Sequence, residues 1–198
     1  MTTPMTEAMT GALAEALAGE PTRPLRRREY DQLIEAGAFA DERIELLEGR
    51  LVVMSPQGSL HASVVQLLTD LLVRAVGERG YVRVQLPLAA SDLSEPEPDF
   101  AVVPRQVYVA DHPTTAALVV EVAESSLRKD RDVKVPLYAH AGVDECWLVD
   151  VGAGVVTVLR DPRGGRYADV ATYRRGDVLT VAAFPDVTVP VAGFLLEG

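Results

Sequence analysis

The sequence predicts an α/β or α+β domain with a mixed β-sheet flanked by helices. Two observations indicate this class. A long amphipathic helix, expected at residues 60–76, is followed by several strand segments and then by another helix. One of the strand segments, residues 117–123, is apolar on both faces apart from Glu121, as expected for a strand that is covered on both sides. Strands bracketed by helices are typical of a layered sheet domain.

The chain has 198 residues and is 48% hydrophobic. It is long enough for one domain with a buried core and too short for two full domains. Residues 1–24 mix Thr, Ala, Gly and Pro with only a weak helical pattern. We expect them to be a flexible N-terminal extension. Residues 25–198 are then the folded domain.

The first half of this domain is predicted to contain a helix, a hairpin and the long helix. Apolar residues at helical spacing before a glycine indicate a short helix at residues 26–37. Alternating apolar residues on both sides of Glu48-Gly49 indicate a hairpin. The i, i+3, i+4, i+7 series then predicts a helix from Leu60 to Val76, with Ser59 as its cap.

The second half is predicted to alternate strands with one further helix. That helix, from Leu127 to His140, contains Pro136, which removes one backbone hydrogen bond and should loosen its first turns. Apolar or alternating segments predict strands at residues 81–89, 99–104, 117–123, 145–151 and 155–161, and a meander at 166–179.

Composition excludes several classes of protein. The single cysteine, Cys146, excludes an intrachain disulfide and a cysteine-based zinc site, and its apolar surroundings favour a buried structural role. No apolar run approaches the roughly 18 residues of a membrane span, and the N-terminus lacks the basic opening of a signal peptide. A cytoplasmic location is the plain inference.

The net charge of −10 argues against a protein that grips nucleic acid over its whole surface. Local basic strips remain compatible with a nucleic-acid partner, although each is also compatible with a solvated face balanced by neighbouring acids. These strips are residues 23–28, 128–134 and 160–175.

Three residues predict a divalent-metal site. Glu121 lies inside a fully apolar strand, where an unpaired charge is costly. Asp99 follows a proline at the start of another strand, and Lys134 lies on the later helix. Carboxylate oxygens and a backbone carbonyl, such as that of Val122, are ligands that Mg²⁺ accepts while it retains several waters. Lys134 could orient a water or offset charge on a phosphate.

Structural explanations compete with this interpretation. Asp99 could be a turn residue after its proline. Glu121 could form a buried ion pair with an arginine, and Lys134 could simply cover its helix.

The segments PDFAVVP, LVVEVAESSLRKDRDVKVPLYAHAGVDECWLVD and RIELLEGRLVVMSPQGSLHASVV together closely resemble the Uma2 family of the PD-(D/E)XK nuclease superfamily. The resemblance covers roughly residues 25–195. Its most specific part is an ordered set of residues rather than any single one: Pro98-Asp99, Glu121, Asp130, Lys134, Tyr138, Gly142 and Trp147.

The resemblance implies a restriction-endonuclease-like core in which Asp99 and Glu121 bind the metal. The superfamily usually places its lysine two residues after the second acid, where this chain has Ala123. Lys134 matches the lysine that this family carries on a helix instead. Glu45 and His61 match further family positions, and Glu45 is expected as an extra ligand or a water-positioning carboxylate.

The leading hypothesis is therefore a Mg²⁺- or Mn²⁺-dependent endonuclease that acts on DNA as a homodimer. A second hypothesis is a nuclease-like fold that binds a nucleic acid or a protein without cutting it. A third is a structural or dimer-forming protein, in which Asp99 and Glu121 would affect only assembly or stability.

Overall fold

The computed structural model describes residues 20–195. Residues 1–19 of the predicted extension therefore lie outside the described part. The helices and short turns of helix in chain order are α2 (Arg27–Glu35), α3 (Ser59–Val76), η1 (Gly77–Arg79), α4 (Leu127–Lys129), the π-helical turn η2 (Asp130–Lys134), α5 (Val135–His140) and η3 (Val191–Gly193).

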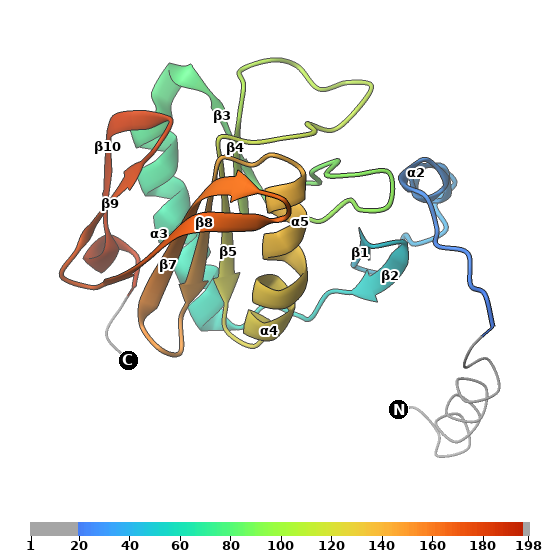
Figure 1. Ribbon diagram of the computed structural model, residues 1–198, viewed down its shortest axis with the longest axis horizontal. Coiled ribbons are helices and arrows are strands. Elements are labelled where there is room, and N and C mark those ends of the chain that lie inside the picture. Colours follow the sequence, from blue (N-terminus) through green and yellow to red (C-terminus); the bar gives the residue numbers. More distant parts are fainter. Residues whose placement is uncertain (1–19, 196–198) are drawn as a thin grey trace.

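A six-stranded mixed sheet is the centre of the molecule, with the order β3-β4-β5-β6-β7-β8. Only β5 and β6 run parallel, and the other neighbours are antiparallel. Its strands are β3 (Tyr81–Val84), β4 (Phe100–Val103), β5 (Leu118–Ala123), β6 (Glu145–Asp150), β7 (Val155–Arg163) and β8 (Arg166–Arg174). The prediction of a mixed sheet flanked by helices is confirmed (Figure 1).

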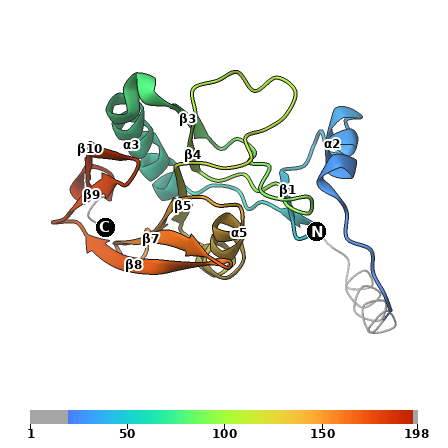
Figure 2. The same ribbon diagram turned by 45° about the horizontal axis from the view of Figure 1, so that its top comes forward.

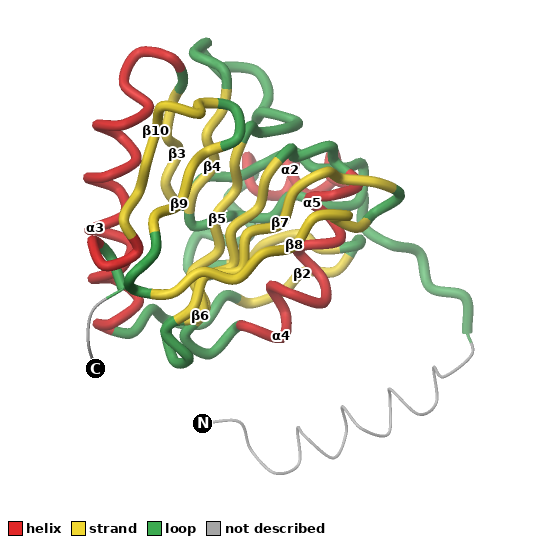
Figure 3. Tube along the Cα trace, turned by 60° about the vertical axis from the view of Figure 1, so that its left-hand side comes forward, coloured by secondary structure: helices red, strands yellow, loops and turns green. Residues whose placement is uncertain are grey.

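Helices cover the two faces of the sheet (Figures 1 and 2). On one face, α3 packs with the small sheet of β9 (Val178–Val181) and β10 (Phe184–Pro190) in the main apolar core, which contains Leu68, Leu72 and Trp147. On the other face, α5 packs through Tyr138 and its neighbours in a second apolar cluster. The tube view shows the sheet between these two layers (Figure 3).

The segment Ser59–Arg79, which contains α3, is long and apolar enough to span a membrane by length and composition alone. A core helix passes the same test, because its buried face must be apolar. Residues Val64, Leu68 and Leu72 lie at helical spacing and are completely buried against the sheet. The apolar character of α3 is therefore used in the core. Its N-terminal cap residue is Gly58, one residue before the predicted Ser59.

The predicted hairpin forms a separate sheet of β1 (Ile44–Leu47) and β2 (Arg50–Val53), which turns at Glu48-Gly49. It packs with α2 beside the main sheet, where Tyr30 and Leu46 share a small apolar cluster. All four residues of β1 are buried. The hairpin therefore closes one side of the domain and carries Glu45 inward.

The helix predicted at residues 127–140 is continuous but changes its geometry before Pro136. Residues 130–134 form a π-helical turn, and the amide of Val135 donates to the carbonyl of Asp130, five residues earlier. A π turn widens the helix where proline cannot supply an amide hydrogen. The irregularity expected at Pro136 is thus a local widening, and both Asp130 and Lys134 are buried within it.

Candidate active site

Asp99 and Glu121 meet at one end of the main sheet. Strands β4 and β5 are antiparallel, and Phe100 is opposite Val120. Continuing this register by one residue brings Asp99, just before β4, beside Glu121, near the end of β5. Because side chains alternate along a strand, Glu121 points away from the α3 face, on which Val120 and Val122 lie, and toward α5.

Asp99 is held by donors from three parts of the chain. The amide of Val122 donates to Oδ2 at 2.8 Å, Gln85 Nε2 donates to Oδ1 at 3.0 Å, and His61 Nε2 lies 3.2 Å from Oδ1. Burial disfavours ionisation of this carboxyl, but the hydrogen bonds from His61, Gln85 and Val122 together lower its pKa below the ordinary value. Asp99 is therefore a carboxylate at neutral pH.

His61, in the first turn of α3, lies against Asp99. The hydrogen bond to Asp99 raises the pKa of the imidazole, against the opposing effect of burial. Its Nδ1 is buried without a hydrogen-bond partner. His61 therefore holds one side of the Asp99 carboxylate and favours its ionised form.

Glu121 is 3% exposed and accepts a short hydrogen bond from the hydroxyl of Tyr138. The ammonium of Lys134 lies 3.2 Å from the same oxygen, Oε1. Burial raises the pKa of Glu121 to about 8, although the nearby Lys134 acts in the opposite direction. The lysine and the tyrosine compensate this buried acid, so the arginine bridge considered from the sequence is replaced by a lysine.

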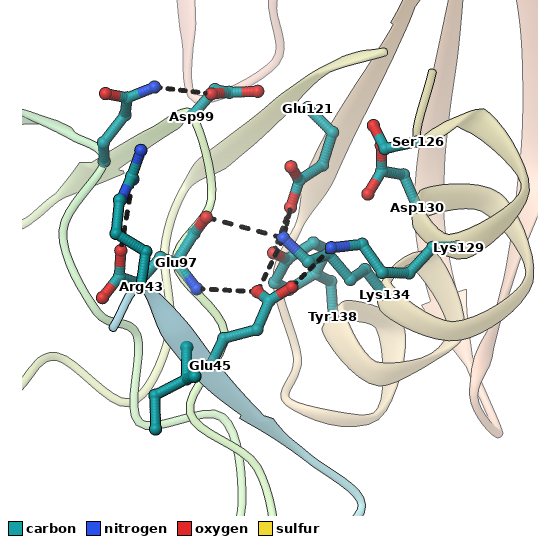
Figure 4. Close-up of polar contacts among 12 residues, drawn as sticks. Arg43, Glu45, Glu97, Asp99, Glu121, Ser126, Lys129, Asp130, Lys134 and Tyr138 are labelled. Carbon is teal, nitrogen blue, oxygen red and sulfur yellow. Dashed lines mark hydrogen bonds and ion pairs between the residues drawn. The ribbon is translucent and has the colours of Figure 1, made fainter. Parts of the chain in front are cut away.

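Glu45 forms ion pairs with Lys129 and Lys134, the two lysines of the helix that follows β5 (Figure 4). Its Oε1 lies 2.7 Å from Lys129 Nζ, and its Oε2 lies 2.9 Å from Lys134 Nζ. The amide of Glu97 also donates to Oε2, at 3.3 Å. Burial opposes ionisation of the completely buried Glu45, but the two ammonium groups lower its pKa. Glu45 is thus the counter-ion of two lysines.

A cavity of about 290 Å³ opens over these groups. Its lining includes His61, Asp99, Glu121, Lys129 and Lys134. The segment between the hairpin and α3, residues 54–58, forms part of the wall. The predicted site residues, with Val122, therefore surround one space, except for Glu45, which lies behind the two lysines.

The donor set of this cavity fits a hard cation. Asp99 and Glu121 offer carboxylate oxygens from adjacent strands, and an ion such as Mg²⁺ binds to one or two carboxylates while keeping several waters. Val122 lines the same cavity, next to Glu121. Within residues 20–195 there is no group of three or more His, Cys, Asp or Glu side chains arranged to hold a metal. Any ion here would depend on two carboxylates, with water or a backbone carbonyl completing its shell.

Several site residues were not identified from the sequence. Gln85 contacts Asp99, Lys129 contacts Glu45, and the carbonyl of Glu97 faces Lys134 at 3.5 Å. Asp130, on the same helix, accepts a hydrogen bond from the hydroxyl of Ser126. For Lys129 the sequence offers only its position five residues before Lys134, and a lysine there is equally compatible with a solvated basic strip.

The mixed sheet, its flanking helices and the acid-lysine site at the ends of β4 and β5 define a restriction-endonuclease-like α/β protein. The model of the family described as "Uma2: Putative restriction endonuclease" matches residues 27–192, and the chain belongs to this family. A solved structure with a similar fold is described as a putative nuclease belonging to DUF820 from Anabaena variabilis. It has a TM-score of 0.73 and 14% sequence identity, covering 87% of this chain and 98% of the other. No curated protein matches significantly.

Proposed function

We propose that this protein is a divalent-metal-dependent endonuclease that hydrolyses phosphodiester bonds in DNA. The observation that carries the proposal is the meeting of Asp99 and Glu121 beside the buried Lys134 in one cavity. Membership of a family described as "Putative restriction endonuclease" supports the same reaction class. The folded part, residues 25–198, is proposed to be a single nuclease domain.

Asp99 and Glu121 are the residues that would hold Mg²⁺ or Mn²⁺, with the carbonyl of Val122 as a further ligand. The bound ion supplies Lewis-acid stabilisation of a phosphate oxygen and a lowered pKa for a water molecule. Around it, His61, Gln85 and the Val122 amide keep Asp99 ionised and fixed in orientation. A ligand held by several hydrogen bonds is positioned before the ion arrives.

The two lysines have different positions relative to the cavity. The side chain of Lys134 is 3% exposed and bridges Glu45 and Glu121, whereas that of Lys129 is 29% exposed. We assign to Lys129 the contact with a substrate phosphate, since its ammonium is closer to solvent. Lys134 then fixes Glu121 and contributes positive potential where negative charge develops on the phosphate.

The charge of the chain sets the conditions for DNA binding. With a net charge of −10, DNA affinity must come from a small number of local contacts. Binding should therefore be weak and should weaken further as salt is added, with a slope set by the number of phosphates contacted. Nuclease folds that cut both strands often work as pairs, and for this reason we propose a homodimer, which size-exclusion chromatography with light scattering would test.

Plasmid nicking tests the proposal. The wild-type protein should convert supercoiled plasmid to open-circle and linear forms with Mg²⁺ or Mn²⁺ and not with EDTA. Asp99→Asn should abolish this conversion. Asp70→Asn, the same chemical change on the exposed face of α3, serves as the matched control and should retain it. Full activity in Asp99→Asn would exclude the assignment, and metal binding without cleavage would favour a binding protein of nuclease fold.

A further inference from the structure

The ammonium of Lys134 occupies a position that resembles a cation site. Its Nζ lies 2.9 Å from Glu45 Oε2, 3.2 Å from Glu121 Oε1 and 3.5 Å from the carbonyl oxygen of Glu97. The three oxygens come from β1, from β5 and from the segment before β4. Two carboxylates and a backbone carbonyl are the ligands that hard divalent cations prefer. The side chain is almost completely buried, so water does not replace these contacts.

This position is distinct from the position in which a metal would bind Asp99. The protein donors to Asp99 are Gln85, which follows β3, His61 on α3 and the Val122 amide of β5. No hydrogen bond or ion pair between Lys134 and Asp99 is found among residues 20–195. Glu121 lines the cavity next to Asp99 and also pairs with Lys134, so it faces both positions. A carboxylate shared in this way is the arrangement expected between two cations in a two-metal site, where the ions lie about 3.5–4 Å apart.

Glu45 is neutralised from both sides. Lys129 occupies its Oε1, and Lys134 occupies its Oε2 together with the Glu97 amide. A completely buried carboxylate needs such partners because desolvation of an unpaired charge is costly. Glu45 therefore has no free oxygen for a metal ion while Lys134 is present.

We propose that Lys134 is a built-in cation that fills a second cation site, formed by Glu45, Glu121 and the Glu97 carbonyl. The wild-type protein then takes at most one divalent ion, at Asp99 and Glu121, and the lysine supplies the second positive charge. The position of that one ion rests on the function proposed above. The occupancy of the second site by Lys134 rests on the contacts of the lysine alone.

The proposal predicts what removal of the lysine charge does. Lys134→Met keeps most of the apolar stem but removes the cation between Glu45 and Glu121. Glu121 then has no cationic partner, and Glu45 keeps only Lys129. A divalent cation that enters this space relieves the repulsion between the two acids. Lys134→Met should therefore bind one more divalent ion per chain than the wild type.

Mn²⁺ is a suitable probe, because the paramagnetic resonance signal of the free ion counts bound ions without any need for activity. The titration is done at pH 8.5 on wild type, Lys134→Met, Lys129→Met and Lys134→Met/Glu45→Gln. Lys129→Met is the matched control, since Lys129 contacts only one carboxylate, and its stoichiometry should equal that of the wild type. The double variant should lose the ion that Lys134→Met gains.

Folding is checked by circular dichroism and by thermal unfolding with and without Mn²⁺. If Lys134→Met is poorly folded without metal, Mn²⁺ should raise its unfolding midpoint far more than that of the wild type, because an ion bound only to the folded state stabilises it. A midpoint that rises equally in both proteins would contradict the proposal.

The outcomes separate this inference from the proposed function. If wild type and Lys134→Met bind the same number of ions, or if the extra ion persists without Glu45, the built-in cation is refuted while the nuclease proposal stands. If the wild type binds no ion and Lys134→Met gains one, the inference holds and the metal-dependent nuclease is excluded. A gain from one ion to two supports both.

Discussion

Glu95 offers the clearest quantitative prediction outside the proposed site. Its side chain is 4% exposed, and its Oε2 has no hydrogen-bond partner. Arg27 and His112 lie at 3.9 Å, too far for hydrogen bonds. Burial, followed by the nearby Asp31, raises the pKa of this carboxyl to about 7 from 4.5, although Arg27 opposes the shift. The folded protein therefore retains a proton that the unfolded chain has already lost.

The sign of the effect on stability follows from this difference. Below about pH 4.5 the carboxyl is protonated in both states, and its contribution to stability is fully present. As the pH rises toward 7, the unfolded chain ionises first, so the free energy of unfolding falls. At about 1.36 kcal/mol per pKa unit, the shift corresponds to a loss of up to about 3 kcal/mol, complete above pH 7.

Glu95→Gln should remove this pH dependence. The variant should match the wild type near pH 4.5 and exceed it by up to about 3 kcal/mol at pH 8. Urea unfolding from pH 4.5 to 8.5, followed by the fluorescence of the buried Trp147, measures both curves. Asp70→Asn, an exposed acid-to-amide change, is the control and should run parallel to the wild type. Parallel curves for Glu95→Gln as well would refute the explanation.

Three further predictions concern other buried acids. Glu145 is completely buried and accepts hydrogen bonds from Arg160, Trp147 and the Ala182 amide. Glu145→Gln should therefore lower the free energy of unfolding, measured with urea, by about 3–5 kcal/mol. A loss below about 1 kcal/mol would contradict this. Glu45→Gln should cost a similar amount, because Lys129 loses its acidic partner and the buried Lys134 keeps only Glu121. A neutral result in the same assay would argue against the cluster. Mn²⁺ binding should strengthen from pH 6 to about 8, because ligation by Glu121 displaces the proton that burial retains on its carboxyl. Calorimetry in two buffers with different ionisation enthalpies should detect proton release on binding. Absence of proton release would count against ligation by Glu121.

Much of the fold could be predicted because its signals are local. The helical spacing of α3, the Glu48-Gly49 turn and the fully apolar β5 each lie within one short segment. Asp99 and Glu121 could be proposed as a pair because a charge in an apolar strand requires a partner. Their proximity is explained by the antiparallel register of β4 and β5, which no local pattern specifies.

The remaining part of the site depends on contacts between distant segments. Lys129 and Glu45 are in contact but are separated by 84 positions in the sequence. The pair of Ser126 and Asp130, by contrast, is only four positions apart. Lys129 lies in a strip of mixed charges, and no local pattern there indicates that its partner is the buried Glu45 on β1. The π turn at 130–134 also departs from the α-helical spacing that a local pattern assumes, and Lys134 pairs with Glu45 and Glu121. The family resemblance predicts Glu45 as an extra ligand or a water-positioning carboxylate, and in the structure its two oxygens contact two lysines.

The most direct test of the central claim is to measure Mn²⁺ binding and plasmid nicking on the same preparations of wild type, Asp99→Asn/Glu121→Gln and Asp70→Asn. We predict that wild type and Asp70→Asn bind the ion and nick the plasmid, and that the double variant, still folded by circular dichroism, does neither. Metal-dependent nicking by the folded double variant would contradict the claim that Asp99 and Glu121 form the active site.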